Sequence, residues 1–209
     1  MDIILARHGE TAWNVGEVFR GRADIELDEN GRQQAGLLGN YLSETEIEAV
    51  YSSPLKRALD TAKAIAGHHG LEVKLEDRLN DLDFGEWEGL TVPEVKDRYG
   101  DLFAMWDSRP ELVKLPGGET LDDVRRRALS VVDEVVARHS GKAVLVTHRV
   151  VIKVLVCALL GLDNSHFWNI MVDTCGLTTF RCQRGHFVLI RHNDNSFLRP
   201  LGKGRLADF

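Results

Sequence analysis

The chain has 209 residues, 44% of them hydrophobic, which is enough to bury the core of one domain over residues 1–209. Its 26 basic and 32 acidic residues give a formal net charge of -6, which argues against nucleic acid or a membrane surface as a partner. No stretch resembles a signal peptide or could span a bilayer, and the three cysteines form no Cys-x-x-Cys pair, so we expect a reducing, cytoplasmic location.

The first predicted element is a buried strand at the apolar residues 3–5. It leads into Arg7 and His8, which places a permanent cation beside an imidazole at the edge of a sheet. Gly9 leaves the backbone free to turn and lets a ligand approach closely. Taken alone, these residues are equally consistent with an ordinary charged loop, and it is the recurrence of the pattern downstream that favours a site.

A second strand is predicted at residues 49–51, and a helix with an apolar stripe follows it. Ser53 is suited to cap that helix, and Pro54 to its first position. Arg57 then lies in the first turn, away from the apolar stripe. A guanidinium therefore stands close to the positive end of a helix, directly after a strand.

The third such strand, at the fully apolar residues 143–146, is the expected centre of a parallel sheet. It ends at Thr147 and His148, and an apolar helix is predicted from there to residue 160.

The remaining elements complete an α/β pattern. They are a helix from Asp28 or Asn30 to Leu42, a half-exposed strand at 71–75, an acidic loop at 80–89, a helical region at 91–105, a helix at 121–137 with a Thr120–Asp123 capping box, a helical turn at 163–168, a hairpin of 177–181 and 187–191, and an irregular tail. This order predicts a three-layer sandwich, with a mostly parallel central sheet flanked by helices.

Arginine and histidine side chains therefore follow three of the predicted strands. In open α/β sheets, ligands bind at the carboxyl ends of the strands, where the crossover helices begin. Guanidinium groups match phosphate oxygens, and helix N-termini offer N–H groups, so the sequence predicts a site for a dianion. A buried structural ion pair is the alternative for Arg57.

At this point five segments of the chain resemble the histidine phosphatase (phosphoglycerate mutase-like) superfamily. They are Arg-His-Gly-Glu-Thr-x-Trp-Asn at 7–14, Ser-Ser-Pro-Leu-x-Arg-Ala at 52–58, Asp-Phe-Gly-x-Trp-Glu-Gly at 83–89, Pro-Gly-Gly-Glu-Thr at 116–120 and Val-Thr-His at 146–148. The resemblance covers nearly the whole chain, and the segments together are highly specific.

The resemblance implies a role for each matching residue. These are His8 as the nucleophile, Asp81 as the proton donor, Arg7, Arg57 and His148 as the phosphate pocket, and Asn14 as a further phosphate contact. Asp83 is a second, less favoured candidate for the acid, because the family more often has a glutamate, one methylene longer, where Asp81 stands.

The chemistry of these groups agrees with the implied roles. A neutral imidazole is a fair nucleophile at pH 7, and transfer first to His8 and then to water divides the hydrolysis into two easier steps. Two guanidinium groups and a protonated His148 would hold the charge of the transition state. A carboxylic acid would protonate the leaving alkoxide and then activate the water. We expect no metal and no other cofactor, since the histidines form no metal-binding motif.

Two arginines depart from the family pattern. Arg20 stands where many relatives have Gln, and Arg149 stands where Gly is common. Arg149 either points to solvent or leans over the mouth of the pocket, with Lys153 one turn further along the same helix face. In the second case, Arg20 and Arg22 would complete a cationic rim that favours substrates with a second anionic group.

The resemblance leaves several activities open. Residues 83–89 look like the short phosphatases, because the mutases carry Glu-Arg-His-Tyr-Gly and a longer insertion there. We therefore expect a hydrolase of small phosphorylated metabolites, with cofactor-dependent phosphoglycerate mutase, α-ribazole-phosphate phosphatase and phosphoserine phosphatase as alternatives. Phe84 argues against phosphoserine, since the phosphoserine phosphatases of this superfamily have a His at that place. A catalytically inactive phosphate-binding module is a further alternative, and a homodimer stays open.

Overall fold

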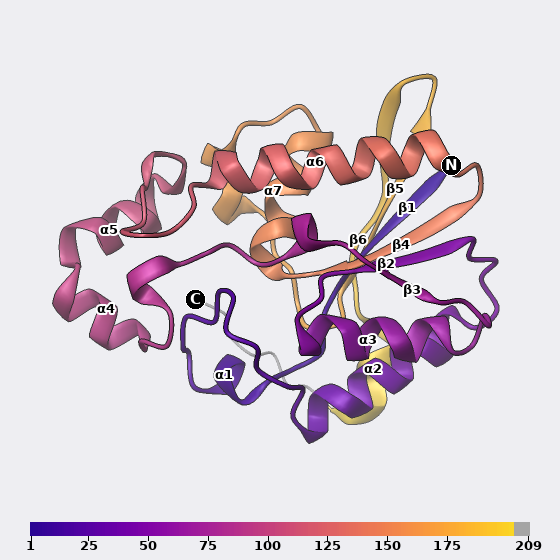
Figure 1. The fold of residues 1–209 in the computed structure, drawn as a ribbon, viewed down its shortest axis with the longest axis horizontal. Coiled ribbons are helices and arrows are strands. Elements are labelled where there is room, and N and C mark those ends of the chain that lie inside the picture. The colour runs from indigo at the N-terminus through magenta and orange to yellow at the C-terminus, as the bar shows by residue number, and fades with distance from the viewer. Residues whose placement is uncertain (203–209) are drawn as a thin grey trace.

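The computed structural model describes residues 1–202, which form a six-stranded sheet in the order β3-β2-β4-β1-β5-β6 (Figure 1). Four strands are parallel; β5, beside β1, is antiparallel to it, and the edge strand β6 is antiparallel to β5. The strands are β1 (Asp2–Arg7), β2 (Ala49–Ser52), β3 (Val73–Leu75), β4 (Lys142–Thr147), β5 (Leu177–Gln183) and β6 (His186–Asp194). The expected mostly parallel sheet is confirmed, with β4 at its centre.

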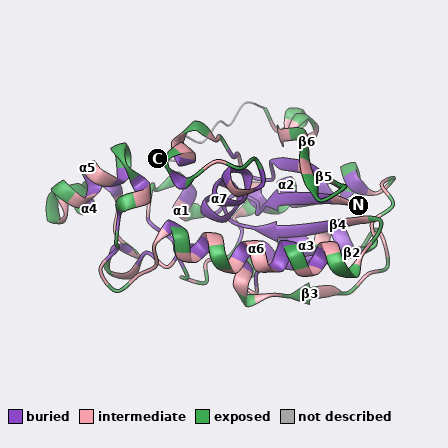
Figure 2. Ribbon diagram, turned by 90° about the horizontal axis from the view of Figure 1, so that it is seen from above, coloured by how far each residue is buried: buried purple, intermediate pink, exposed green. Residues whose placement is uncertain are grey.

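Helices cover both faces of the sheet, which completes the expected sandwich (Figure 1). The paired layers are α2 (Glu29–Leu42) with α3 (Lys56–Ala66), and α6 (Leu121–Arg138) with α7 (Arg149–Leu159). Successive side chains of β1 divide between the layers, as the pleat of a strand requires. Ile3 and Leu5 pack in the cluster with α6 and α7, whereas Ile4 and Ala6 pack in the cluster with α2 and α3. Figure 2 shows the buried central strands between helices whose outer surfaces are exposed.

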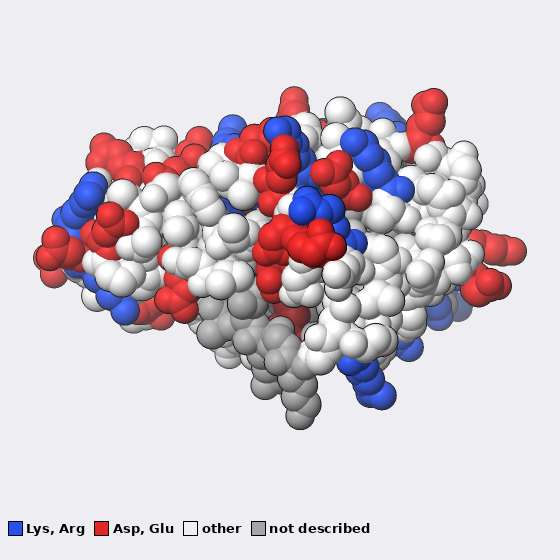
Figure 3. Space-filling view, turned by 90° about the horizontal axis from the view of Figure 1, so that it is seen from below, with Lys and Arg blue, Asp and Glu red and all other residues white. Residues whose placement is uncertain are grey.

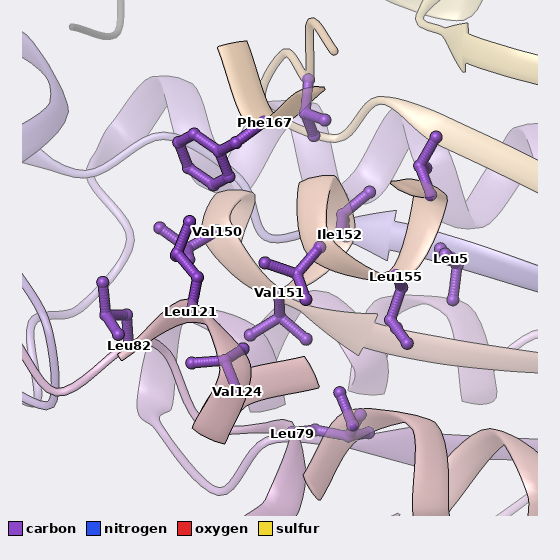
Figure 4. Close-up of a cluster of buried hydrophobic side chains, with 14 of the residues drawn as sticks. Leu5, Leu79, Leu82, Leu121, Val124, Val150, Val151, Ile152, Leu155 and Phe167 are labelled. Carbon is purple, nitrogen blue, oxygen red and sulfur yellow. The ribbon is translucent and has the colours of Figure 1, made fainter. Parts of the chain in front are cut away.

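The cluster on the α6 and α7 side reaches from the sheet to the segment that follows β3. Figure 4 shows Leu79 and Leu82 of that segment beside Val124 of α6 and Val151 of α7. All four side chains are fully buried. Burying such a side chain stabilises the fold by roughly 1.5–3 kcal/mol. Asn80 and Asp81, at the start of the acidic loop, are therefore anchored to the core on both sides, by Leu79 and Leu82.

The shorter elements lie outside the sandwich. They are α1 (Ala12–Val15), α4 (Val92–Arg98), α5 (Gly100–Ser108) and tight helical turns at Asp77–Leu79, Gly85–Trp87, Pro110–Leu112, Asn164–Asn169 and Ser196–Leu201. Figure 1 shows α4 and α5 together at one end of the molecule. None of the helices among the described residues is both long and apolar enough to cross a bilayer.

Three local expectations need correction. The helix after β2 begins at Lys56, not Pro54, and its N-cap is Leu55, whose backbone is extended; the Ser53 hydroxyl accepts from the N–H of Leu55 (3.3 Å) before the helix begins. The helical region at 91–105 is two helices, which meet at Tyr99. The tail contains a helical turn where irregular structure was expected. The capping box of Thr120 and Asp123 is confirmed.

Candidate functional site

The carboxyl ends of β1, β2 and β4 lie side by side. In the parallel registers, Arg7 is opposite Thr147 and Ser52 is opposite Val146. The backbone N–H of His8 continues the ladder to Thr147 O (3.1 Å), and that of Ser53 continues it to Val146 O (3.1 Å). The residues after these three strands are therefore brought together, as the sequence predicted.

His8 is buried and has a fixed orientation. Its Nδ1 lies 2.6 Å from the carbonyl oxygen of Gly9. Because a carbonyl oxygen only accepts, Nδ1 carries the proton, and Nε2 of the neutral ring carries the lone pair. Burial, and then the nearby charges of Arg57, Arg7 and Arg20, hold the pKa of His8 well below its ordinary value of 6.5. The ring is therefore a neutral nucleophile at pH 7.

Gly9 has a packing role that the sequence did not predict. A Cβ at this position would lie 2.5 Å from the carbonyl oxygen of Gly31, and a Cβ on Gly31 would lie 2.0 Å from the carbonyl oxygen of Glu10. The two glycines thus let the loop after β1 pack directly against the start of α2. Gly9 serves backbone packing that supports His8.

Arg7 and Arg57 are fully buried cations beside His8. Arg7 Nη1 donates to Val172 O (2.8 Å), and Arg57 donates to Ala23 O (2.7 Å) and Gly21 O (2.8 Å). These bonds to neutral carbonyls orient the guanidinium groups without cancelling their charge. Arg57 Nη2 also lies 3.6 Å from Asp81 Oδ2, so the ion pair considered as its alternative role is present and joins it to the candidate acid.

His148 is held by Ser53. The Ser53 hydroxyl donates to Asn80 Oδ1 (2.7 Å), so its oxygen accepts from Nε2–H of His148 (2.9 Å). The other ring nitrogen, Nδ1, faces Asp81 Oδ2 at 3.8 Å, and the ring centroid lies 5.2 Å from that of His8. Asn80 and Ser53 were not predicted as parts of the site, and Ser53 was interpreted as a helix cap.

The proton expected on His148 in the transition state is not held by the ring in the protein without substrate. Burial, followed by the charge of Arg57, holds the pKa of this imidazole well below its ordinary value of 6.5. Taking a charged ring out of water is costly, and the neighbouring guanidinium adds repulsion. His148 is therefore neutral until an anion enters the pocket.

Asp81 and Asp83 lie in clearly different places. Asp81 is buried, and burial raises the pKa of its carboxyl above its ordinary value of 3.8 against the opposing charges of Arg57 and Arg20. Asp83 instead accepts from its own loop at Gly85 N (2.9 Å) and pairs with Arg22 at 3.7 Å. Only Asp81 faces the imidazole and guanidinium groups of the pocket.

A hollow that opens to solvent adjoins Asp81. Its walls are mostly apolar and aromatic and include two cations, Arg20 and Arg149. The lining residues are Val18, Phe19, Arg20, Asp81, Phe84, Trp106, Arg149, Val150, Phe167 and Trp168. A largely apolar lining with a few charged groups is typical of a small-molecule site. Trp106 and Trp168 were not predicted here, because nothing in their local sequence distinguishes them from core residues.

Arg149 leans over this hollow and does not point away from it. Its guanidinium lies 5.4 Å from the ring centroid of Trp168, and the ammonium of Lys153 lies 4.3 Å from the same ring. The indole N–H of Trp168 donates to Trp106 O (2.7 Å), which fixes the ring. The expectation that Arg149 and Lys153 share a helix face is confirmed. Lys153 is buried and does not line the hollow.

The other predicted binding residues are divided. Arg20 lines the hollow and donates to Trp13 O (3.2 Å). Arg22 does not line the hollow. Its guanidinium pairs with Asp83 and with Glu119 (3.4 Å), so Arg22 is not part of the expected cationic rim. Asn14 is buried in α1, where its Oδ1 accepts from the N–H and hydroxyl of Thr11.

The wider surface agrees with the charge balance of the sequence. On the face drawn in Figure 3, acidic side chains stand beside basic ones, and no broad basic area is visible. Across the described residues, no three His, Cys, Asp or Glu side chains are grouped so that they could hold a metal ion.

Comparisons with known proteins agree with this geometry. The profile of the histidine phosphatase superfamily (branch 1) matches residues 3–195. Phosphoserine phosphatase 1 of Hydrogenobacter thermophilus is 38% identical over 192 residues, which cover 91% of each chain. The solved structure of Bacillus stearothermophilus YhfR is 34% identical with a TM-score of 0.91, covering 95% of this chain and 99% of that one. Mycobacterial glucosyl-3-phosphoglycerate phosphatase, solved with VO3, is 30% identical with a TM-score of 0.86, covering 92% and 98%.

Proposed function

We propose that this chain, which belongs to the histidine phosphatase superfamily and is a phosphatase of small phosphorylated metabolites, works through a phosphohistidine at Nε2 of His8. In the first step the Nε2–P bond forms, the P–O bond breaks, and the leaving oxygen takes a proton from Asp81. In the second step water attacks phosphorus, gives its proton to Asp81, and the Nε2–P bond breaks. The observation that carries the proposal is the bond from Nδ1 of His8 to Gly9 O, which leaves the lone pair on Nε2.

The buried cations support a phosphoryl site. Arg7 and Arg57 hold the phosphoryl oxygens, and Asn14 adds a further contact through its amide. Because α7 begins directly after His148, the positive end of a helix also lies at the floor of the pocket. Arrival of the dianion raises the pKa of His148, so the ring takes up a proton and donates from Nδ1 to a phosphoryl oxygen. These charges hold the transition state without a metal.

Asp81 is the acid and base of the two steps. Its raised pKa keeps a fraction of the carboxyl protonated for donation to the leaving oxygen. Its contacts at 3.6 Å to Arg57 and 3.8 Å to His148 place it beside the same phosphoryl position. Asp83 instead faces Arg22 and its own loop, away from this position.

The mouth of the pocket favours substrates with a second anionic group. Arg149 and Arg20 are the two cations that line the hollow beside Asp81. Phosphoserine and glucosyl-3-phosphoglycerate, the substrates named for two of the relatives, both carry a carboxylate besides the phosphate. We assign Arg149 to that carboxylate. The phosphatase acts in the cytoplasm, in agreement with the cysteine pattern.

Trapping the intermediate tests the mechanism. Phosphatase incubated with ³²P-labelled substrate and denatured in alkali should retain label, and acid should remove it. His8→Ala should retain none. Chelation by EDTA should leave turnover unchanged. An acid-stable label, or loss of activity that only a divalent metal restores, would contradict the proposal.

The same protein distinguishes the mutase alternative. Bisphosphoglycerate added to 3-phosphoglycerate should produce inorganic phosphate and no 2-phosphoglycerate. Isomerisation faster than phosphate release would make the chain a mutase.

A further inference from the structure

We infer that Arg127, on α6, is a positioning residue that holds Asp81 and, through Asn80 and Ser53, the ring of His148. The inference rests on the proposed function, in which Asp81 is the acid. Arg127 lies 46 residues from Asp81 in the sequence, and no motif of the chain includes it.

Every N–H group of the Arg127 guanidinium has an acceptor. Nη1 donates to the carbonyl oxygens of Arg78 (2.7 Å) and Asn80 (2.6 Å). Nη2 donates to the carbonyl oxygen of Asp81 (2.9 Å) and to Glu119 Oε2 (2.9 Å), and Nε donates to Glu119 Oε1 (2.9 Å). One side chain, 14% exposed, thus binds three carbonyls of the segment that carries the acid.

Glu119 extends these hydrogen bonds to Asp83, two residues after Asp81. Its Oε2 accepts from the N–H of Asp83 (3.0 Å), and its own N–H donates to Asp83 O (2.9 Å). Residues 80–84 belong to no helix or strand, so the backbone around Asp81 has no regular ladder to orient it. The ion pair of Arg127 with Glu119 instead supplies the hydrogen bonds that orient this backbone.

The same contacts reach the second imidazole. Arg127 fixes the main chain of Asn80, whose Oδ1 accepts the Ser53 hydroxyl. The Ser53 oxygen is thereby turned to accept from Nε2–H of His148, which leaves Nδ1 facing the phosphoryl position. A displacement of this loop would therefore disturb the acid and the tautomer of His148 together.

Arginine is needed because the acceptors are spread across a plane. Lysine has the same charge but presents three donors around a single nitrogen, which cannot reach three carbonyls and a carboxylate. Arg127→Lys therefore keeps the positive charge near Asp81 and His148 but removes the planar set of N–H donors. The matched control is Arg125→Lys on the same helix, where the arginine donates to Leu162 O (2.8 Å) away from the acid loop.

The experiment compares kcat/KM for glycerol 3-phosphate, an alkyl phosphate, and for p-nitrophenyl phosphate. This ratio includes only the steps up to departure of the leaving group, and the aryl group needs little protonation. Arg127→Lys should lose at least about tenfold more kcat/KM on the alkyl than on the aryl phosphate. Arg125→Lys should lose equally on both, and thermal unfolding of each variant verifies its fold.

The outcomes separate the inference from the proposed function. Asp81→Asn serves as the reference for a missing acid. Selective loss in Asp81→Asn with equal losses in Arg127→Lys would overturn the positioning role. No selectivity in Asp81→Asn would overturn the acid itself. Should Arg127→Lys fail to fold, Glu119→Gln weakens the same set of hydrogen bonds, and selectivity in the same direction is expected; equal losses there would also overturn the inference.

Discussion

The floor and the mouth of the pocket are built in different ways. The floor consists of buried residues at the ends of neighbouring strands, Arg7, His8 and His148, whose places follow from the ladder between β1 and β4. The mouth is assembled from side chains of separate loops and helices, among them Arg20, Arg149 and Trp168. A sheet edge places its residues rigidly, whereas packed loops accept substitution. In the proposed function the floor therefore carries the reaction, and the mouth selects the substrate.

The largest expected effect is at the floor. His8→Ala removes the atom that accepts the phosphoryl group, so kcat should fall by at least about 10⁴-fold on every substrate. Steady-state assays on alkyl and aryl phosphates measure this, with circular dichroism to show an intact fold. Retention of more than a few percent of the activity on either substrate would exclude His8 as the nucleophile.

The next effect concerns Asp81, which lines the hollow and faces His148 of the floor. Asp81→Asn removes the proton donor but leaves the phosphate pocket, so kcat/KM should fall about 10²–10⁴-fold on alkyl phosphates and much less on aryl phosphates. Asp83→Asn is the matched control, because its carboxylate faces Arg22. A larger loss in the control would assign the acid to Asp83.

A smaller and selective effect is expected at the mouth. Arg149→Gln should lower kcat/KM about tenfold to a hundredfold on phosphoserine and 3-phosphoglycerate, since a partly desolvated charge-assisted contact contributes roughly 1.5–3 kcal/mol. The loss on p-nitrophenyl phosphate should be slight. The same substitution at Arg22, outside the hollow, should change no preference among the three substrates. Equal losses in Arg149→Gln on all three would remove this arginine from substrate recognition.

The smallest effect is on stability. The pKa values of His8 and His148 are held below 6.5 in the folded protein, so below that pH the unfolded chain binds protons that the folded protein does not. The free energy of unfolding should therefore decrease as the pH falls below 6.5. Asp81, whose pKa is raised, opposes this closer to its ordinary value of 3.8.

Urea denaturation at about pH 7.5 and about pH 5.5 measures this stability effect. The decrease on acidification should be smaller in His148→Gln, which cannot titrate. An unchanged decrease would place its origin in other groups of the protein.

The difference between the floor and the mouth of the pocket also explains which features could be predicted from the sequence. The strands, the layered fold and the floor could be predicted, because apolar runs define buried strands and the residues that follow them must meet at one sheet edge. The cap of α6 was equally local, since Thr120 and Asp123 are three residues apart. The start of α3 was not predicted correctly, because the backbone stays extended as far as Leu55, and the bond from Ser53 to His148, 95 residues away, could not be read from local spacing.

The sequence by itself predicted which side chains form the candidate site, since each was recognised from its neighbours along the chain. The tertiary structure alone decided their states and supports: the neutral ring of His148, the pairing of Arg22 with Asp83, the position of Arg149 against Trp168 and the grip of Arg127 on the acid loop. These properties depend on burial and on contacts between segments far apart in the chain. Local spacing carries no information about the distance between such segments, so only the packed fold could reveal them.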